Sequence, residues 1–227
     1  MVTARRQATA AAPLPCPTVL LTGFDAFGGA QLNPSWLAVH ALHGRRVAGH
    51  RVIAAQLPTV FGESLQVLHD LLLEHRPSLV ICVGQAGGRG TVSLERVALN
   101  VEDARIADNA AAQPVDRPVI SGGPTAYFTT LPIKSMLLAL QHEGVAAEVS
   151  QTAGTFVCNH VFYGLMHTLA TQRGFRHTRG GFIHLPFLPE QGNPSMSQDD
   201  MVRGLRAAIR CALRTTHDSA HGAGSLH

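Results

Sequence analysis

Short apolar runs and longer amphipathic stretches alternate along most of the chain. Apolar runs of strand length, several of them ended by glycine or proline, occupy residues 18–22, 51–57, 78–83, 145–149 and 180–186. Apolar residues at the spacing of one buried helix face occur in residues 34–42, 60–75, 132–144, 161–169 and 199–213. Strands that alternate with helices favour a mostly parallel, twisted sheet covered by helices on both faces. The pattern therefore predicts an α/β fold, arranged as a three-layer α/β/α sandwich.

The same pattern predicts where a ligand would bind. In an open sheet of this kind, ligands bind in the crevice outside the carboxyl ends of the strands. The strand ends at Gly23, Gly84, Gln151 and His184 are therefore expected to line one crevice. Residues 92–101, in which apolar and polar positions alternate, are expected to form a further strand.

Three parts of the chain lie outside this alternation. Residues 1–17 are rich in alanine and broken by proline, and residues 216–227 carry no apolar periodicity. We expect both to be disordered tails of a single α/β domain that spans residues 18–215. Residues 102–132 form a long polar, proline-rich segment. Loops of this length inside a compact domain are usually functional or disordered.

Composition narrows the class of protein. The formal net charge of +3 over 227 residues, without a cluster of lysine and arginine, argues against nucleic acid or a membrane surface as the partner. No apolar run approaches the roughly 18 residues of a membrane span. Pro13, Pro15 and Pro17 interrupt the apolar stretch that a signal peptide needs. We therefore expect a cytoplasmic protein.

The cysteines exclude several metal and redox motifs. They stand alone in the sequence, without a Cys-x-x-Cys pair, at Cys16, Cys82, Cys158 and Cys211. Neither a zinc ribbon nor a thioredoxin-like motif is available, and sparse cysteines fit a reducing compartment. The glycine-rich loop at 23–29 matches only the first half of a phosphate-binding loop, because Gly29-Ala30 stands where Lys-Ser/Thr is needed. No metal or cofactor is expected.

Cys158 is the cysteine whose position suggests chemistry. It lies where the apolar run 145–149 gives way to a helical pattern, so helix-end N–H groups and the helix dipole would favour its thiolate. The alternative is a buried structural cysteine, which behaves as a small hydrophobic side chain. A nucleophilic cysteine also needs a histidine within reach.

Three histidines can be compared as that partner. His160 follows Cys158 by two residues, which on a helix directs it about 200° away. His167 lies roughly 14 Å further along the same helix. His184 ends a predicted strand at the same sheet edge and is the best candidate. A third group usually orients the imidazole; spacing alone leaves three candidates for it, Glu95, Glu102 and Asp103.

Several blocks of the sequence, in order, resemble the pyroglutamyl-peptidase I family of cysteine peptidases. They are Leu21-Thr22-Gly23-Phe24-Asp25-Ala26-Phe27-Gly28-Gly29, Gly84-Gln85-Ala86-Gly87-Gly88-Arg89, Glu95-Arg96-Val97-Ala98-Leu99-Asn100, Thr152-Ala153-Gly154-Thr155-Phe156-Val157-Cys158-Asn159-His160 and Phe182-Ile183-His184-Leu185-Pro186. The resemblance implies a catalytic Glu95, Cys158 and His184. It also implies an α/β/α sandwich, no metal or cofactor, and cytosolic homo-oligomers that are often tetramers.

The reaction implied by this resemblance is hydrolytic removal of an N-terminal pyroglutamyl residue from peptides through a thioester. A pyroglutamyl ring is a flat, uncharged lactam, which calls for apolar walls and a few placed polar groups. The residues expected to supply them are Phe24, Phe27, Thr59, Gln85, Ile106, Phe156 and Val157, of which Thr59 and Ile106 come from the family correspondence alone. The backbone N–H of Cys158 and the side chain of Arg105 are candidate oxyanion donors.

Two alternatives remain open from the sequence. One is a cysteine amidase that acts on another lactam or acyl-amide. The other is a catalytically silent homologue that only binds its ligand. For each phenylalanine in the predicted pocket, plain core packing is the competing interpretation.

Overall fold

The computed structural model describes residues 16–224 of the chain. Its strands are β1 (Thr18–Phe24), β2 (Arg46–Val47), β3 (His50–Leu57), β4 (Leu79–Gln85), β5 (Val92–Glu95), β6 (Val97–Leu99), β7 (Ala126–Phe128), β8 (Ala147–Ser150) and β9 (Arg179–Leu185). Its α-helices are α1 (Pro34–His40), α2 (Glu63–His75), α3 (Ile133–His142), α4 (Val157–Thr171) and α5 (Gln198–Arg214), and a single 3-10 turn, η1, spans Arg173–Phe175.

A seven-stranded sheet in the order β2-β3-β1-β4-β9-β5-β8 forms the centre of the molecule. The pairs β1–β3, β1–β4, β4–β9 and β5–β8 are parallel. The short β2 is antiparallel to β3, and β5 is antiparallel to β9. The predicted α/β fold with a mostly parallel sheet is confirmed.

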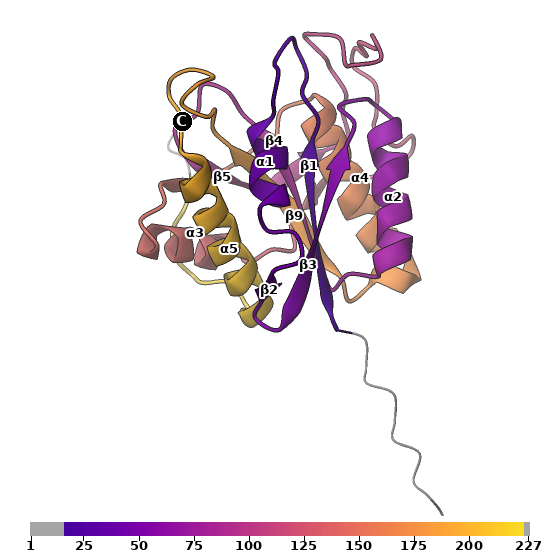
Figure 1. The fold of residues 1–227 in the computed structure, drawn as a ribbon. Helices are drawn as coiled ribbons and strands as arrows, with labels where there is room; N and C mark the ends of the chain where they lie inside the picture. Colours follow the sequence, from indigo (N-terminus) through magenta and orange to yellow (C-terminus); the bar gives the residue numbers. More distant parts are fainter. Residues whose placement is uncertain (1–15, 225–227) are drawn as a thin grey trace, which may run out of the picture.

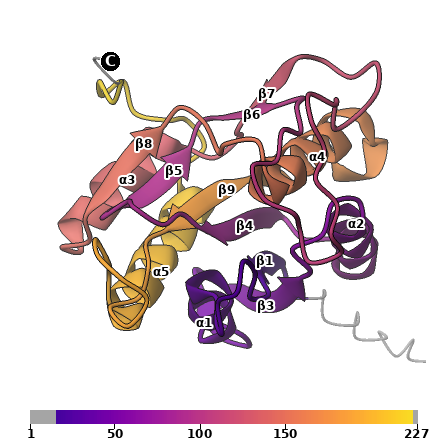
Figure 2. The same ribbon diagram turned by 90° about the horizontal axis from the view of Figure 1, so that it is seen from above.

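Helices cover both faces of this sheet (Figures 1 and 2). One apolar core joins α1, α3 and α5 to one face, and a second joins α2 and α4 to the other. The central strand β4 is buried along nearly its whole length, which explains why its sequence is an almost continuous apolar run. The arrangement is the predicted three-layer α/β/α sandwich.

The stretch 92–101, predicted as one strand, is two strands in different sheets. Its first half, β5, lies in the main sheet, whereas β6 pairs with β7 in a separate two-stranded sheet. Arg96 lies between them: its N–H donates to Ser150 O, at the end of β8, and its carbonyl accepts from Thr129 N. The chain therefore leaves the main sheet directly after Glu95.

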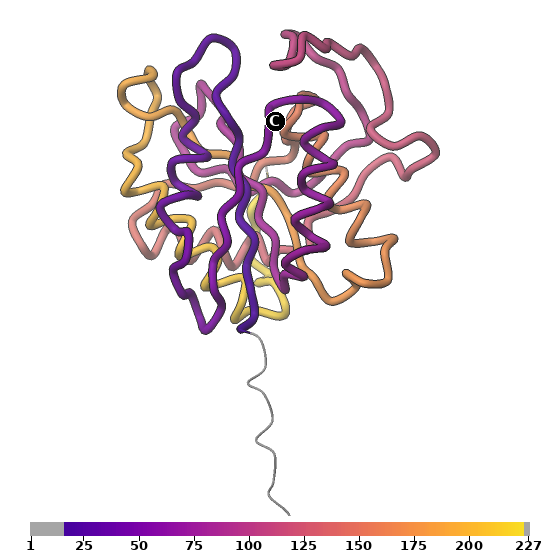
Figure 3. The backbone as a smooth tube through the Cα atoms, turned by 45° about the vertical axis from the view of Figure 1, so that its right-hand side comes forward, coloured from indigo at the N-terminus to yellow at the C-terminus, as the bar shows by residue number. Residues whose placement is uncertain are grey.

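The long segment 102–132 is held by specific hydrogen bonds. Glu102 and Arg117 form a backbone bridge, with N–H to carbonyl distances of 2.7 and 3.1 Å. The carboxylate of Asp108 accepts N–H bonds from Phe61, Ala110 and Ala112. Figure 3 shows the segment arching over one end of the molecule. A long loop of this kind is usually functional or disordered, and these hydrogen bonds argue against disorder.

The two predicted tails differ in what the structure describes. Most of residues 1–17 lies outside the described residues. In the C-terminal segment, expected to be disordered, the described part makes defined contacts instead: the carboxylate of Asp218 accepts N–H bonds from Lys134 and Ser135 at the start of α3. This carboxylate therefore caps a helix end, a contact that local composition does not reveal. Within residues 16–224, none of the helices has the length and apolarity to cross a membrane.

Candidate active site

Cys158 lies at the start of α4, against the C-terminal part of β4. It is the second residue of the helix, and its sulfur is so close to Gly84 that a Cβ atom placed on that glycine would lie 2.7 Å from Sγ. Only a residue without a side chain therefore fits at position 84. The same Cβ would lie 2.9 Å from the ring of Phe182, so Cys158 and Phe182 occupy the same face of the sheet.

His184 lies on that face as well. It is the register partner of Gly84 in the parallel pair β4–β9, and register partners in adjacent strands direct their side chains to the same face. The His184 side chain is 4% exposed, and the Phe182 ring packs against its imidazole with centroids 4.8 Å apart. Cys158 and His184 thus both lie next to Gly84 on this face. Among the described residues, no hydrogen bond joins Cys158 Sγ to His184 in this structure.

The antiparallel course of β5 brings a carboxylate to the same histidine. Ser93 is the β5 residue opposite His184, and Glu95 lies two positions further on the same face. His184 Nδ1 lies 2.7 Å from Glu95 Oε1, which also accepts a 2.9 Å bond from Arg89 Nη1. Glu95 is fully buried, and a buried carboxylate needs such partners. Its second oxygen, Oε2, has no hydrogen-bond partner among the described residues.

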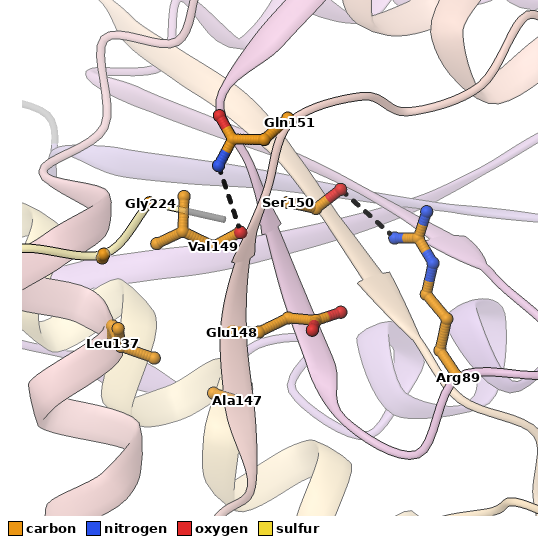
Figure 4. Close-up of a pocket in the computed structure, with 9 residues that line it drawn as sticks. Arg89, Leu137, Ala147, Glu148, Val149, Ser150, Gln151 and Gly224 are labelled. Carbon is orange, nitrogen blue, oxygen red and sulfur yellow. Dashed lines mark hydrogen bonds between the residues drawn. The ribbon is translucent and has the colours of Figure 1, made fainter. Parts of the chain in front are cut away.

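Arg89 is the member of this cluster whose role could not be predicted from the sequence. It belongs to the glycine-rich loop after β4, and its guanidinium also lies 3.5 Å from Ser150 Oγ. Figure 4 shows it beside Ser150, at the border of a cavity of about 570 Å³ that Glu148 also lines. A buried glutamate predicts a nearby cation in general, and only the fold shows that Arg89 supplies it.

The thiol of Cys158 is less acidic than the helix-dipole argument predicts. Burial raises the pKa of Cys158 to about 12, the Glu95 carboxylate raises it further, and the Arg89 guanidinium acts in the opposite direction. Desolvation of Cys158 therefore acts against the helix-end effect that the sequence indicates. A base is needed to remove the thiol proton.

A second glutamate–histidine pair contains His160, which follows Cys158 by two residues in the sequence. His160 Nδ1 lies 2.7 Å from Glu102 Oε1, and Arg117 Nη2 lies 3.3 Å from Glu102 Oε2. His160 Nε2 accepts the backbone N–H of Gly62 at 2.9 Å. The helix geometry directs His160 away from Cys158, and these contacts show what it binds instead.

Four of the predicted pocket residues line open cavities. Phe27, Gln85 and Ile106 line a cavity of about 600 Å³. Phe156 and Ile106 line a neighbouring cavity of about 240 Å³, together with Arg105. The rings of Phe27 and Phe156 pack with centroids 6.0 Å apart. The structure therefore brings these residues together around Ile106, which is 47% exposed.

The other three predicted pocket residues are closed off from water in this structure. Phe24 packs against Phe182 with centroids 6.4 Å apart, and Val157 lies in the core between the sheet and α4. Thr59 donates its N–H to Asp25 Oδ1 at 2.7 Å. Their direct contact with a ligand stays a prediction, because all three side chains are buried in the structure.

No metal centre is indicated by the described residues. Across residues 16–224, no group of three or more histidine, cysteine, aspartate or glutamate side chains is arranged to hold a metal ion. The buried polar groups at Cys158 instead form a thiol, an imidazole and a carboxylate linked to a guanidinium. Such a set suits nucleophilic acyl transfer.

Comparison with known sequences identifies the family. A family model described as pyroglutamyl peptidase matches residues 17–215, which is most of the chain. The chain belongs to the pyroglutamyl peptidase family. The match includes Glu95, Cys158 and His184 and both glycine-rich loops.

Curated relatives of this family member are similar over nearly their full length. Pyrrolidone-carboxylate peptidase 1 of Ralstonia nicotianae is 57% identical over 216 residues, covering 93% of this chain and 100% of the relative. The pyrrolidone-carboxylate peptidase of Bacillus cytotoxicus is 52% identical, covering 92% of this chain and 99% of the relative.

Solved structures of the family share the fold. The crystal structure of pyroglutamyl peptidase I from Bacillus amyloliquefaciens superposes with a TM-score of 0.87 at 48% identity, covering 89% of this chain and 100% of that one. A mutant pyrrolidone carboxyl peptidase of Pyrococcus furiosus gives a TM-score of 0.82 at 39% identity, covering 86% of this chain and 98% of that one.

Proposed function

We propose that this chain is a cysteine exopeptidase that removes N-terminal pyroglutamate from peptides by hydrolysis. The observation that carries the proposal is the placement of Cys158 and His184 next to Gly84 on one face of the sheet, with Glu95 bonded to the histidine. Family membership and the names of relatives with 52–57% identity support the same activity.

The proposed reaction begins with proton transfer from the thiol. His184 Nε2 accepts the Cys158 proton while Nδ1 donates to Glu95, so the carboxylate stabilises the imidazolium that forms. Sγ attacks the pyroglutamyl carbonyl, and the new C–S bond gives a tetrahedral intermediate. The bond from carbonyl carbon to nitrogen then breaks as His184 gives its proton to the leaving amine, which leaves a thioester. His184 next takes a proton from water, whose oxygen attacks the thioester and releases pyroglutamate and the thiol.

Arg89 helps to keep Glu95 in place for this cycle. It holds the same oxygen, Oε1, that faces His184, and its positive charge offsets the cost of a buried carboxylate. The oxyanion is proposed to bind the backbone N–H of Cys158 at the start of α4, where the first N–H groups of the helix lack helical acceptors. Arg105 is a second candidate donor from the side of the smaller cavity.

Recognition of the lactam is proposed to use the walls that the structure exposes. Phe27, Ile106 and Phe156 supply apolar surface, and the backbone at Gln85, at the end of β4, supplies polar groups for the lactam edge. Phe24, Thr59 and Val157 support these walls from behind. The side chains of Phe27, Ile106 and Phe156 are uncharged, which suits an uncharged ring rather than the ammonium group of an ordinary N-terminus.

The test compares two reporters and two cysteine variants. A pyroglutamyl-amide reporter should be hydrolysed about 100-fold or more faster than the matched prolyl-amide, which lacks the lactam carbonyl. Cys158→Ala should abolish hydrolysis, and Cys211→Ala on α5 should not. Equal rates on the two reporters would indicate a less selective acyl-amidase, hydrolysis by Cys158→Ala would contradict the mechanism, and inactivity of the unaltered protein would indicate a silent binding homologue.

The proposal also covers the oligomeric state and the cellular location of the protein. A homo-oligomer, of which the tetramer is the expected form, and a cytoplasmic location follow from the family resemblance. Light scattering on the purified protein measures the first, and fractionation of cells that express it measures the second.

A further inference from the structure

The cavity beside the proposed lactam site is larger than the lactam needs. Its volume of about 600 Å³ lies in the range of pockets that hold a drug-sized molecule, whereas a pyroglutamyl group is one small ring. Phe27, Gln85 and Ile106 account for the lactam side. The remaining lining residues, 28–32 together with Phe187, Glu190 and Gln191, are not among those proposed to contact the lactam.

The position of His184 shows which part of the substrate faces these remaining residues. In the proposed mechanism His184 gives its proton to the leaving amine, so the amine must depart next to the end of β9. The chain continues from β9 through Pro186 directly into Phe187 and on to Gln191. The residue bonded to the leaving amine therefore emerges against the segment 187–191.

Hydrogen bonds and packing hold the segment 187–191 in place. Gln191 Nε2 donates to Gln85 Oε1 at 3.0 Å and to Leu32 O at 3.3 Å, so one side chain joins three parts of the cavity. Gln191 Oε1 accepts the N–H of Leu188 at 2.9 Å. The Phe187 ring packs over Gly87, where any side chain would clash with it. The cavity is thus preformed, as ligand sites usually are.

We infer that the side of the cavity between residues 28–32 and 187–191 binds the amino acid that follows pyroglutamate, and that Glu190 favours a basic side chain there. This inference rests on the proposed function. Glu190 is the only charged residue among the described residues that line the cavity, and it is exposed at the rim. Arg105 lines the neighbouring smaller cavity instead.

The chemistry of the wall fits a lysine or arginine side chain. The aliphatic stem of such a residue can lie along Phe187 and Leu32 while its charged end stays in water near Glu190. An exposed charge at a rim changes affinity modestly and makes it depend on salt. We therefore expect a preference for lysine over glutamate of about fivefold at low ionic strength, which shrinks as salt is added.

The test uses three peptides that differ only in the residue after pyroglutamate, which is lysine, alanine or glutamate. In the unaltered protein, kcat/KM should fall in that order. Glu190→Gln should bring the ratio of lysyl to glutamyl rates close to one. Glu74→Gln, which removes the same charge from the exposed end of α2, should keep the ratio of the unaltered protein.

Binding of the same peptides to Cys158→Ala, measured by calorimetry, separates this inference from the chemistry. The affinities should follow the order lysine, alanine, glutamate, and Glu190→Gln in that background should remove the order. A lysyl to glutamyl ratio of one in the unaltered protein, or a ratio that survives Glu190→Gln, overturns the inference. If none of the peptides is cleaved, the proposed function fails, and the order of the affinities alone decides whether the subsite exists.

Discussion

Two buried arrays in this molecule are built from the same three residue types. In one, Glu95 lies between His184 and Arg89; in the other, Glu102 lies between His160 and Arg117. In both, histidine Nδ1 lies 2.7 Å from a glutamate oxygen. Both histidines are 4% exposed. A search for buried glutamate–histidine pairs would therefore return both arrays as equals.

The second imidazole nitrogen separates them. His160 Nε2 accepts the Gly62 N–H, so it carries no proton, and Nδ1 must donate to Glu102. That imidazole has both nitrogens occupied by the protein. Among the described residues, no hydrogen bond engages His184 Nε2, and Cys158 and His184 both lie next to Gly84 on one face of the sheet. In the Glu102 array, the histidine joins segments of the chain. In the Glu95 array, Nε2 of the histidine is left to accept a proton during the proposed reaction.

The consequences for the fold differ in the same way. Through Glu102 and Gly62, His160 ties α4 to the segment 102–132 and to the turn before α2. The Phe61 ring packs edge-on against both His160 and Phe156, at centroid distances of 5.4 Å. His160 therefore stabilises the surroundings of the pocket without meeting the thiol.

Exchange of the two histidines for alanine should give the largest contrast in activity. His184→Ala removes the proposed base, and kcat/KM on a pyroglutamyl-amide should fall by about 10²–10⁴-fold. His160→Ala, assayed well below its unfolding temperature, should lose less than about tenfold, because it acts only through pocket geometry. Circular dichroism establishes that both variants are folded. A larger loss in His160→Ala than in His184→Ala would reverse the assignment of the two arrays.

Substitution of the two glutamates should give the same contrast in activity, with smaller losses. Glu95→Gln keeps the shape of the side chain but removes the charge that stabilises the His184 imidazolium, so kcat should fall by about 10²-fold with KM little changed. Glu102→Gln should change kcat by less than about threefold. Steady-state kinetics on one reporter measures both. Equal losses in kcat for the two variants would show that the arrays are not functionally distinct.

The two histidine variants should rank in the opposite order for loss of thermal stability than for loss of activity. These effects should be the smallest of the three predictions. His160→Ala leaves the Gly62 N–H and one Glu102 oxygen without their partner, which should cost about 2 kcal/mol and lower Tm by about 4–8 °C. His184→Ala loses one hydrogen bond, and Arg89 still holds Glu95. Its Tm should fall by less than half as much, as measured by calorimetric scans at one pH. A greater loss of Tm in His184→Ala would contradict the structural role given to His160.

Much of the fold could be predicted because local apolar patterns were strong. The run 78–83 is β4, buried on both faces, and the helical spacing in 60–75 is α2. The antiparallel course of β5 could not be predicted, because strand order depends on long-range pairing that no local pattern records. The break between β5 and β6 at Arg96 could not be predicted for the same reason. The backbone partners of Arg96, Ser150 and Thr129, lie far away in the sequence.

The site could be predicted in part. Position in the pattern favoured Cys158 and His184, and the family resemblance added Glu95, which spacing alone could not distinguish from Glu102 or Asp103. The role of Arg89 could not be predicted, because the tertiary structure determines which cation lies next to a buried carboxylate. The acidity of Cys158 depends on burial as well as on the helix start, and the sequence shows only the helix start.

The pH dependence of Cys158 alkylation by iodoacetamide, read by peptide mass spectrometry, tests the central claim most directly. Thiolate is the reactive form, and burial raises the pKa of Cys158 to about 12, so alkylation near neutral pH needs a base that takes the thiol proton as Sγ attacks. The unaltered protein and His160→Ala should react readily near pH 7.5, because His184 accepts the proton. His184→Ala should react slowly there and gain rate steadily towards high pH. Unchanged alkylation in His184→Ala, or its loss in His160→Ala, would contradict the account.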